Sequence, residues 1–124
     1  GAELRERLDC RFRARAITLK GIRAIYAGGP MNNPERYLEQ SLDIDPTETL
    51  ARAYYGEIAP QRVAIFLRYA EFAEAEAYLD RFERYVPENI DVWKLREKLY
   101  STWGQPEKAA AAQKKYDELL SVGR

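Results

Sequence analysis

The sequence predicts an all-α protein of about six or seven helices, with successive helices as antiparallel neighbours. Residues that break helices, mainly Gly, Pro and Asn, divide the 124 residues into stretches of helical length. Within these stretches, apolar residues recur at steps of three and four, the spacing of one helix face. No stretch combines β-branched residues with alternating polarity, so no sheet is expected.

The N-terminal part predicts a long helix over residues 3–27 and a short one over residues 34–44 that begins at Pro34. The long helix carries one stripe of large apolar residues, namely Leu4, Leu8, Phe12, Leu19, Ile22 and Tyr26. A second stripe consists mainly of small residues, namely Cys10, Ala14, Ile17, Gly21 and Ala24. A helix with two apolar stripes is expected to lie between other helices.

The remaining helices also follow from breakers and apolar spacing. Gly56 and Pro60 are expected to separate two helices, at residues 47–55 and 60–70. The second of these is apolar almost all round, which predicts a central position. Three more helices, each with one apolar face, are expected over residues 73–85, 90–103 and 107–121.

Composition excludes several classes of function. Twenty basic and twenty acidic residues give a formal net charge of zero, so no overall field attracts nucleic acid or anionic lipid. The chain has no His and one Cys, Cys10, which removes the commonest general base and the imidazole metal ligand. No apolar run is long enough to span a membrane. We therefore expect a protein that is not an enzyme and holds no metal or cofactor, with Cys10 in a packing role.

Part of the sequence repeats with a period of 34 residues. The pairs at this displacement are Phe66 with Tyr100, Ala70 with Gly104, Ala75 with Ala109, and Phe82 with Tyr116. This period and its alternation of small and large residues are typical of the tetratricopeptide repeat, a helix–turn–helix unit. The chain resembles this family over residues 13–120, most strongly over residues 60–109.

The resemblance is carried by individual positions of the last two repeats. In the last repeat they are Trp93, Tyr100, Gly104 and Ala109, and in the middle repeat they are Phe66, Ala70, Ala75, Leu79, Phe82 and Pro87. The sequence departs from the family pattern at Arg96, Glu97, Gln113 and Ser121. The resemblance implies one domain over residues 1–124, folded as a short right-handed α-solenoid of about three repeats. Its expected parts are an irregular first repeat over 3–46, an extra segment over 47–59, and regular repeats over 60–89 and 90–122.

The resemblance also implies a binding surface. Family members commonly bind ligands in a concave groove lined by the first helix of each repeat. The corresponding residues are Gln61, Ala64, Arg68, Lys94, Lys98, Ser101 and Thr102. The basic row among them indicates an acidic segment of another protein or peptide as the partner, so the implied function is a non-catalytic scaffold. The asparagine-rich clamp with which some members hold a peptide carboxylate is not reproduced.

Three alternatives remain open. The N-terminal helix contains Arg5, Arg7, Arg11, Arg13 and Arg15, a composition that favours an RNA or another anionic surface. Pairing of these arginines with the acidic residues of 28–58 is the favoured interpretation, so nucleic acid is not the expected partner. The chain begins with Gly1 and not Met, which keeps open a regulatory or oligomerisation appendage of a larger enzyme or envelope protein. The apolar ends of a short solenoid also allow pairing of two copies.

One charged residue, Arg96, is expected to have a structural role. Arg96 lies among Trp93, Tyr100 and Trp103 in the sequence pattern of the helix at 90–103. Its aliphatic stem can pack against these rings, while its guanidinium can stack on a ring or meet a carboxylate of the preceding helix. We therefore expect Arg96 to stabilise the fold.

Overall fold

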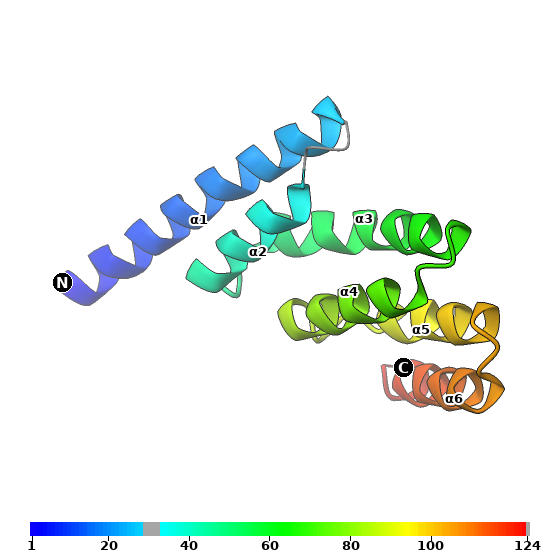
Figure 1. The fold of residues 1–124 in the computed structure, drawn as a ribbon. Coiled ribbons are helices and arrows are strands. Elements are labelled where there is room, and N and C mark those ends of the chain that lie inside the picture. The colour runs from blue at the N-terminus through cyan, green and yellow to red at the C-terminus, as the bar shows by residue number, and fades with distance from the viewer. Residues whose placement is uncertain (29–32, 124) are drawn as a thin grey trace. The chain divides into compact units, whose positions relative to one another are not determined.

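The computed structural model describes residues 1–28 and 33–123 (Figure 1). These residues form six helices and no strand, so the all-α prediction is confirmed for the described part of the chain. The helices are α1 (Ala2–Ala27), α2 (Pro34–Ile44), α3 (Thr49–Arg68), α4 (Phe72–Tyr85), α5 (Asp91–Thr102) and α6 (Pro106–Val122). The irregular turn expected around residues 28–33 falls largely on residues 29–32, which lie outside the described residues.

Five helices lie within one residue of their expected limits, but α3 differs from the prediction. It is a single helix in which Pro60 is an interior residue, so the expected break between residues 47–55 and 60–70 is wrong. A fully buried stripe of small and large side chains runs through the proline at steps of four, namely Ala51, Tyr55, Ala59 and Val63. An interior proline costs roughly 3 kcal/mol, and burial of this continuous face offsets that cost.

The chain divides into two compact units, Gly1–Gly56 and Glu57–Arg124, here called unit 1 and unit 2. The boundary falls inside α3, between Gly56 and Glu57. Unit 1 contains α1, α2 and the first part of α3. Unit 2 contains the second part of α3 with α4, α5 and α6.

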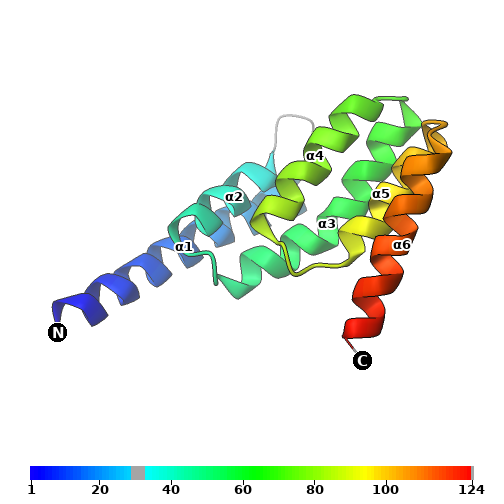
Figure 2. The same ribbon diagram turned by 90° about the horizontal axis from the view of Figure 1, so that it is seen from below.

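In unit 1, α1 and α2 lie side by side in both ribbon views (Figures 1 and 2). The small-residue stripe of α1 forms the contact, with Ala14 and Gly21 buried. A Cβ atom at Gly21 would lie 3.0 Å from Cδ2 of the buried Leu38 in α2. The absence of a side chain at Gly21 therefore permits the close approach of the two helices.

The other stripe of α1 is exposed, which corrects the prediction that α1 lies between helices. The exposed fractions are 58% for Leu4, 42% for Leu8, 72% for Phe12, 41% for Leu19 and 77% for Tyr26. The physical reason is that α2 covers only the small-residue side of α1. It is also shorter, with 11 residues against the 26 of α1.

In unit 2, the turns before α4 and before α6 have the same backbone geometry. Ala70 and Gly104 have positive φ angles of 56° and 77°. The next residue in each turn donates its N–H to the carbonyl five residues earlier, Glu71 to Phe66 and Gln105 to Tyr100, both at 2.8 Å. Positions that the 34-residue period pairs in the sequence thus occupy equivalent places in two turns.

Candidate functional site

The seven residues expected at a binding groove all have exposed positions in unit 2. Gln61, Ala64 and Arg68 form one row on α3, while Lys94, Lys98 and Thr102 form a second row on α5 at steps of four. The remaining residue, Ser101, lies beside that row and donates its hydroxyl to Glu97 Oε1 at 2.9 Å. We call these seven residues the α3/α5 rows.

Within the α5 row, the side chains make few contacts with the rest of the fold. Lys94 Nζ lies 5.5 Å from the centroid of the Tyr116 ring of α6, within range of a cation–π contact. The hydroxyl of Thr102 donates to the carbonyl oxygen of Lys98 at 2.8 Å. The α5 row therefore presents two ammonium groups at an exposed surface, with one of them resting beside an aromatic ring.

The opposite side of α5 is fixed by Arg96, whose exposed fraction is 6%. Its Nη2 donates to Glu83 Oε1 at 2.7 Å and to Asp80 Oδ1 at 2.9 Å, both in α4. Its guanidinium also lies 5.3 Å from the centroid of the Trp93 ring. Burial alone would lower the pKa of Arg96, but the two carboxylates raise it above its ordinary value. The expected contacts of Arg96 with an aromatic ring and with carboxylates of the preceding helix are confirmed.

A buried polar network lies in unit 1 around Glu48, the residue before α3. Glu48 Oε2 accepts hydrogen bonds from the Ala51 N–H at 3.0 Å and from the Thr18 hydroxyl at 2.5 Å. Its other oxygen accepts from Arg15 at 2.7 Å. Burial alone would raise the pKa of Glu48, but the hydrogen bonds from Thr18, Arg15 and Ala51 lower it below its ordinary value.

The same network reaches α2. The Ser41 hydroxyl donates to the carbonyl oxygen of Ala14 at 2.7 Å and lies 2.7 Å from the hydroxyl of Thr18. The expected pairing of the N-terminal arginines with acidic residues of 28–58 is thus confirmed for Arg15. Sequence reasoning gave Glu48 no role, because the side chains that donate to it, Thr18 and Arg15, come from another helix, α1.

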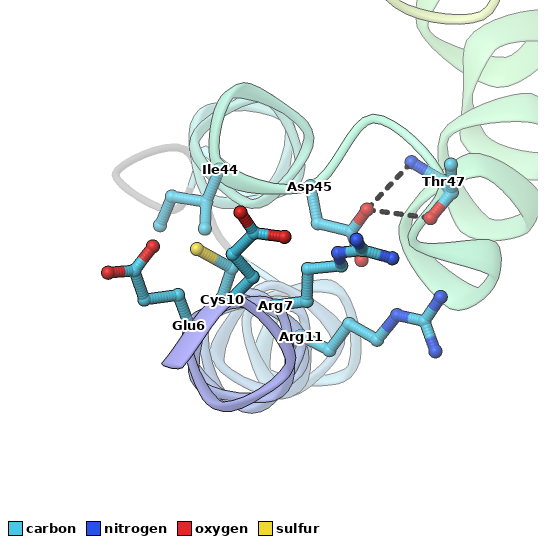
Figure 3. Close-up of a pocket in the computed structure, with 8 residues that line it drawn as sticks. Glu6, Arg7, Cys10, Arg11, Ile44, Asp45 and Thr47 are labelled. Carbon is cyan, nitrogen blue, oxygen red and sulfur yellow. Dashed lines mark hydrogen bonds between the residues drawn. The ribbon is translucent and has the colours of Figure 1, made fainter. Parts of the chain in front are cut away.

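An open pocket of about 560 Å³ lies in unit 1 between the first half of α1 and the end of α2 (Figure 3). Its lining residues are Glu3, Glu6, Arg7, Cys10, Arg11, Ile44, Asp45 and Thr47. Asp45 Oδ1 accepts hydrogen bonds from the N–H and the hydroxyl of Thr47, at 3.0 and 2.6 Å. The half-buried thiol of Cys10 has no imidazole to activate it, since the chain lacks His. The pocket combines both signs of charge and assembles no nucleophile–base pair.

The described residues contain no group of three or more side chains suited to hold a metal ion. Across residues 1–28 and 33–123, no helix is both long enough and apolar enough to cross a membrane. Comparison with known proteins finds no matching family model, curated protein or solved structure.

Proposed function

We propose that the protein is a non-catalytic scaffold that binds an acidic segment of another protein through the α3/α5 rows of unit 2. The observation that carries this proposal is the exposure of all seven residues on helices whose opposite faces are buried. Three of the seven, Arg68, Lys94 and Lys98, are basic. Exposed cations that the core does not use are available to a partner.

The proposal includes a tetratricopeptide-like arrangement of α3 with α4 and of α5 with α6. It is supported by the two equivalent turns at Ala70 and Gly104, which lie 34 residues apart. Buried small residues at the same displacement, Ala75 and Ala109, give further support because they allow close helix packing. In such an arrangement the first helices of successive repeats line a common surface, which suits an extended or helical ligand.

The test is a selection of peptides from a displayed random library on the immobilised protein, followed by affinity measurements with the enriched peptides. We expect enrichment in Asp and Glu and a large loss of affinity in the Lys94→Glu/Lys98→Glu variant, because the change adds repulsion to the lost attraction. The matched control is Lys114→Glu/Lys115→Glu, which makes the same change of charge at exposed positions of α6.

Three results decide the proposal. Retention of binding by the α6 control and loss by the α5 variant support it. Equal loss in both variants indicates a response to net charge alone and contradicts it. Enrichment of peptides without acidic residues also contradicts it. Melting temperatures of all three proteins exclude unfolding as the cause of a loss.

A further inference from the structure

A second exposed surface lies on α1, in unit 1. We define the α1 seam as Leu4, Leu8, Phe12, Leu19 and Tyr26, whose exposed fractions run from 41% to 77%. On a helix of 3.6 residues per turn these five side chains fall within an arc of about 80° and extend along roughly 33 Å. The seam is thus a narrow apolar strip along nearly the whole of α1, interrupted at Arg15.

The charged residues within and beside the seam are all arginines. Arg5, Arg11 and Arg23 lie about 60° from its midline, and Arg15 lies about 20° from it, inside the arc of the seam; each has an exposed side chain. The acidic residues of α1, namely Glu3, Glu6 and Asp9, lie about 100° or more from that midline. Arg15 is ion-paired with Glu48, while its side chain stays 46% exposed. The seam therefore combines apolar contact area with charges that are all positive.

The width and spacing of the seam fit a single helix. From Leu8 onward, residues 8, 12, 15, 19, 22 and 26 follow steps of four and three, the spacing of a helix–helix seam, with Arg15 and the half-buried Ile22 at two of these positions. A helix that lies on a lipid surface presents a broader apolar face and keeps its opposite side in water. The side of α1 at Ala14 and Gly21 is instead buried against α2, so the geometry favours a protein helix over a membrane.

A second copy of the chain does not suit this surface. Antiparallel pairing of two α1 helices along the seam brings arginines of one copy toward those of the other, and α1 itself has no carboxylate within about 60° of the midline to offset the repulsion. A partner whose apolar positions are bordered by Asp and Glu gains both hydrophobic contact and charge complementarity.

We infer that the α1 seam binds an amphipathic helix of another protein whose apolar stripe is bordered by acidic residues. This surface lies in unit 1 and is separate from the α3/α5 rows. The two surfaces suit ligands of different shape. A groove holds a segment between helices, whereas the seam pairs with a single helix along its length.

The probe is a synthetic peptide of about three heptads with Leu at positions a and d and Glu at e and g. Its counterpart carries Lys in place of every Glu. Binding to the full chain is measured by fluorescence anisotropy at about 0.1 M salt, where exposed charges still interact. We expect the acidic peptide to bind and the basic peptide to fail.

Two variants and one matched control locate the binding surface. The change Arg11→Glu/Arg23→Glu reverses charge beside the seam, and Phe12→Gln/Leu19→Gln removes apolar contact within it. The control, Arg13→Glu/Lys20→Glu, makes the same reversal at exposed positions of α1 away from the seam. We expect each seam variant to weaken binding by about tenfold or more and the control by less than about twofold. All substituted side chains are exposed, so circular dichroism should show unchanged helix content.

Several outcomes would overturn the inference: no binding of the acidic peptide, equal binding of the basic peptide, or equal loss in the control. Binding to vesicles of anionic lipid in place of the peptide would assign the seam to a membrane. Self-association in sedimentation velocity that the seam variants abolish would assign it to a second copy. The Lys94→Glu/Lys98→Glu variant should bind the acidic heptad peptide normally, which separates this inference from the proposed function of unit 2.

Discussion

Glu48 connects two helices of unit 1 through its buried carboxylate. Its carboxylate accepts hydrogen bonds from α1 through Thr18 and Arg15, and from the first turn of α3 through Ala51. Its exposed fraction is 4%, so these donors replace most of its contact with water. Removal of its charge would leave those donors without an equivalent acceptor.

We predict that Glu48→Gln lowers the free energy of unfolding by about 1–3 kcal/mol at neutral pH, through weaker bonds from Arg15 and Thr18. The pKa of Glu48 in the folded protein lies below the ordinary value of 4.5, so its stabilisation is present above that value. It is lost as the pH falls through the folded-state pKa. The difference between wild type and variant should therefore shrink at acid pH, as measured by urea titration at several pH values.

The control for this prediction is Glu118→Gln, which removes a carboxylate at an exposed position of α6. It should change stability by less than about 0.5 kcal/mol. A difference between wild type and Glu48→Gln that stays constant from neutral to acid pH would contradict a charged Glu48 in the folded protein.

At the scale of elements, substitutions in the two equivalent turns of unit 2 are expected to change stability in opposite directions. Ala70 adopts a positive φ angle that costs an L-residue with a side chain roughly 1–2 kcal/mol, whereas Gly104 adopts it freely. We predict that Ala70→Gly raises the free energy of unfolding by about 0.5–1 kcal/mol and that Gly104→Ala lowers it by a similar amount.

The substitution Gly104→Ala introduces no steric clash, because a Cβ atom there would meet nothing within 4 Å. The measured effect then reports backbone conformation and not a clash. Denaturant titrations of the two variants and of Ala111→Gly, at an exposed position inside α6, complete the set. Ala111→Gly should destabilise, so a loss of stability in Ala70→Gly of the same size would refute the turn geometry.

Helix packing in unit 2 gives a second prediction at this scale. Ala75 and Ala109 are 0% and 7% exposed, whereas Ala111 is exposed. We predict that replacement of Ala75 or Ala109 by Leu costs about 1–3 kcal/mol through overpacking, while Ala111→Leu is nearly neutral. Equal effects of the three substitutions on the denaturation midpoint would contradict this helix register.

The sequence was sufficient to predict the helix starts and ends that are marked by helix-breaking residues. Pro34 begins α2 as expected, because a proline costs no hydrogen bond at the first helical position. It was insufficient at Pro60, because the local signal of a break was outweighed by a buried stripe that only the folded chain completes. The exposed stripe of α1 was missed for the same reason, since periodicity identifies an apolar face but not its neighbour.

For the binding surfaces, the exposure of Lys94 and Lys98 follows from their position opposite the apolar face of α5. Their role in binding remains a prediction. Glu48 could not be identified in advance, because a buried carboxylate depends on donors that Thr18 and Arg15 bring from a distant helix.

Across the whole molecule, stability is expected to be uneven. The N-terminal end of α1 extends past α2 in both ribbon views, and residues 1–9 are all exposed (Figures 1 and 2). A short helical segment without packing partners is only marginally stable in water. We predict that amide hydrogens of residues 5–9 exchange fastest within α1 and those of residues 14–21 more slowly, as measured by mass spectrometry. Uniform protection along α1 would contradict this distribution.

The position of Cys10 has a practical consequence for spectroscopy. The chain holds one thiol, so a fluorophore or spin label attaches at a single site without prior substitution. Cys10 lies on α1 about 160° around the helix from the midline of the seam. A reporter there moves with the helix while leaving the seam open, so it can register the ordering of the N-terminal turns when a ligand binds.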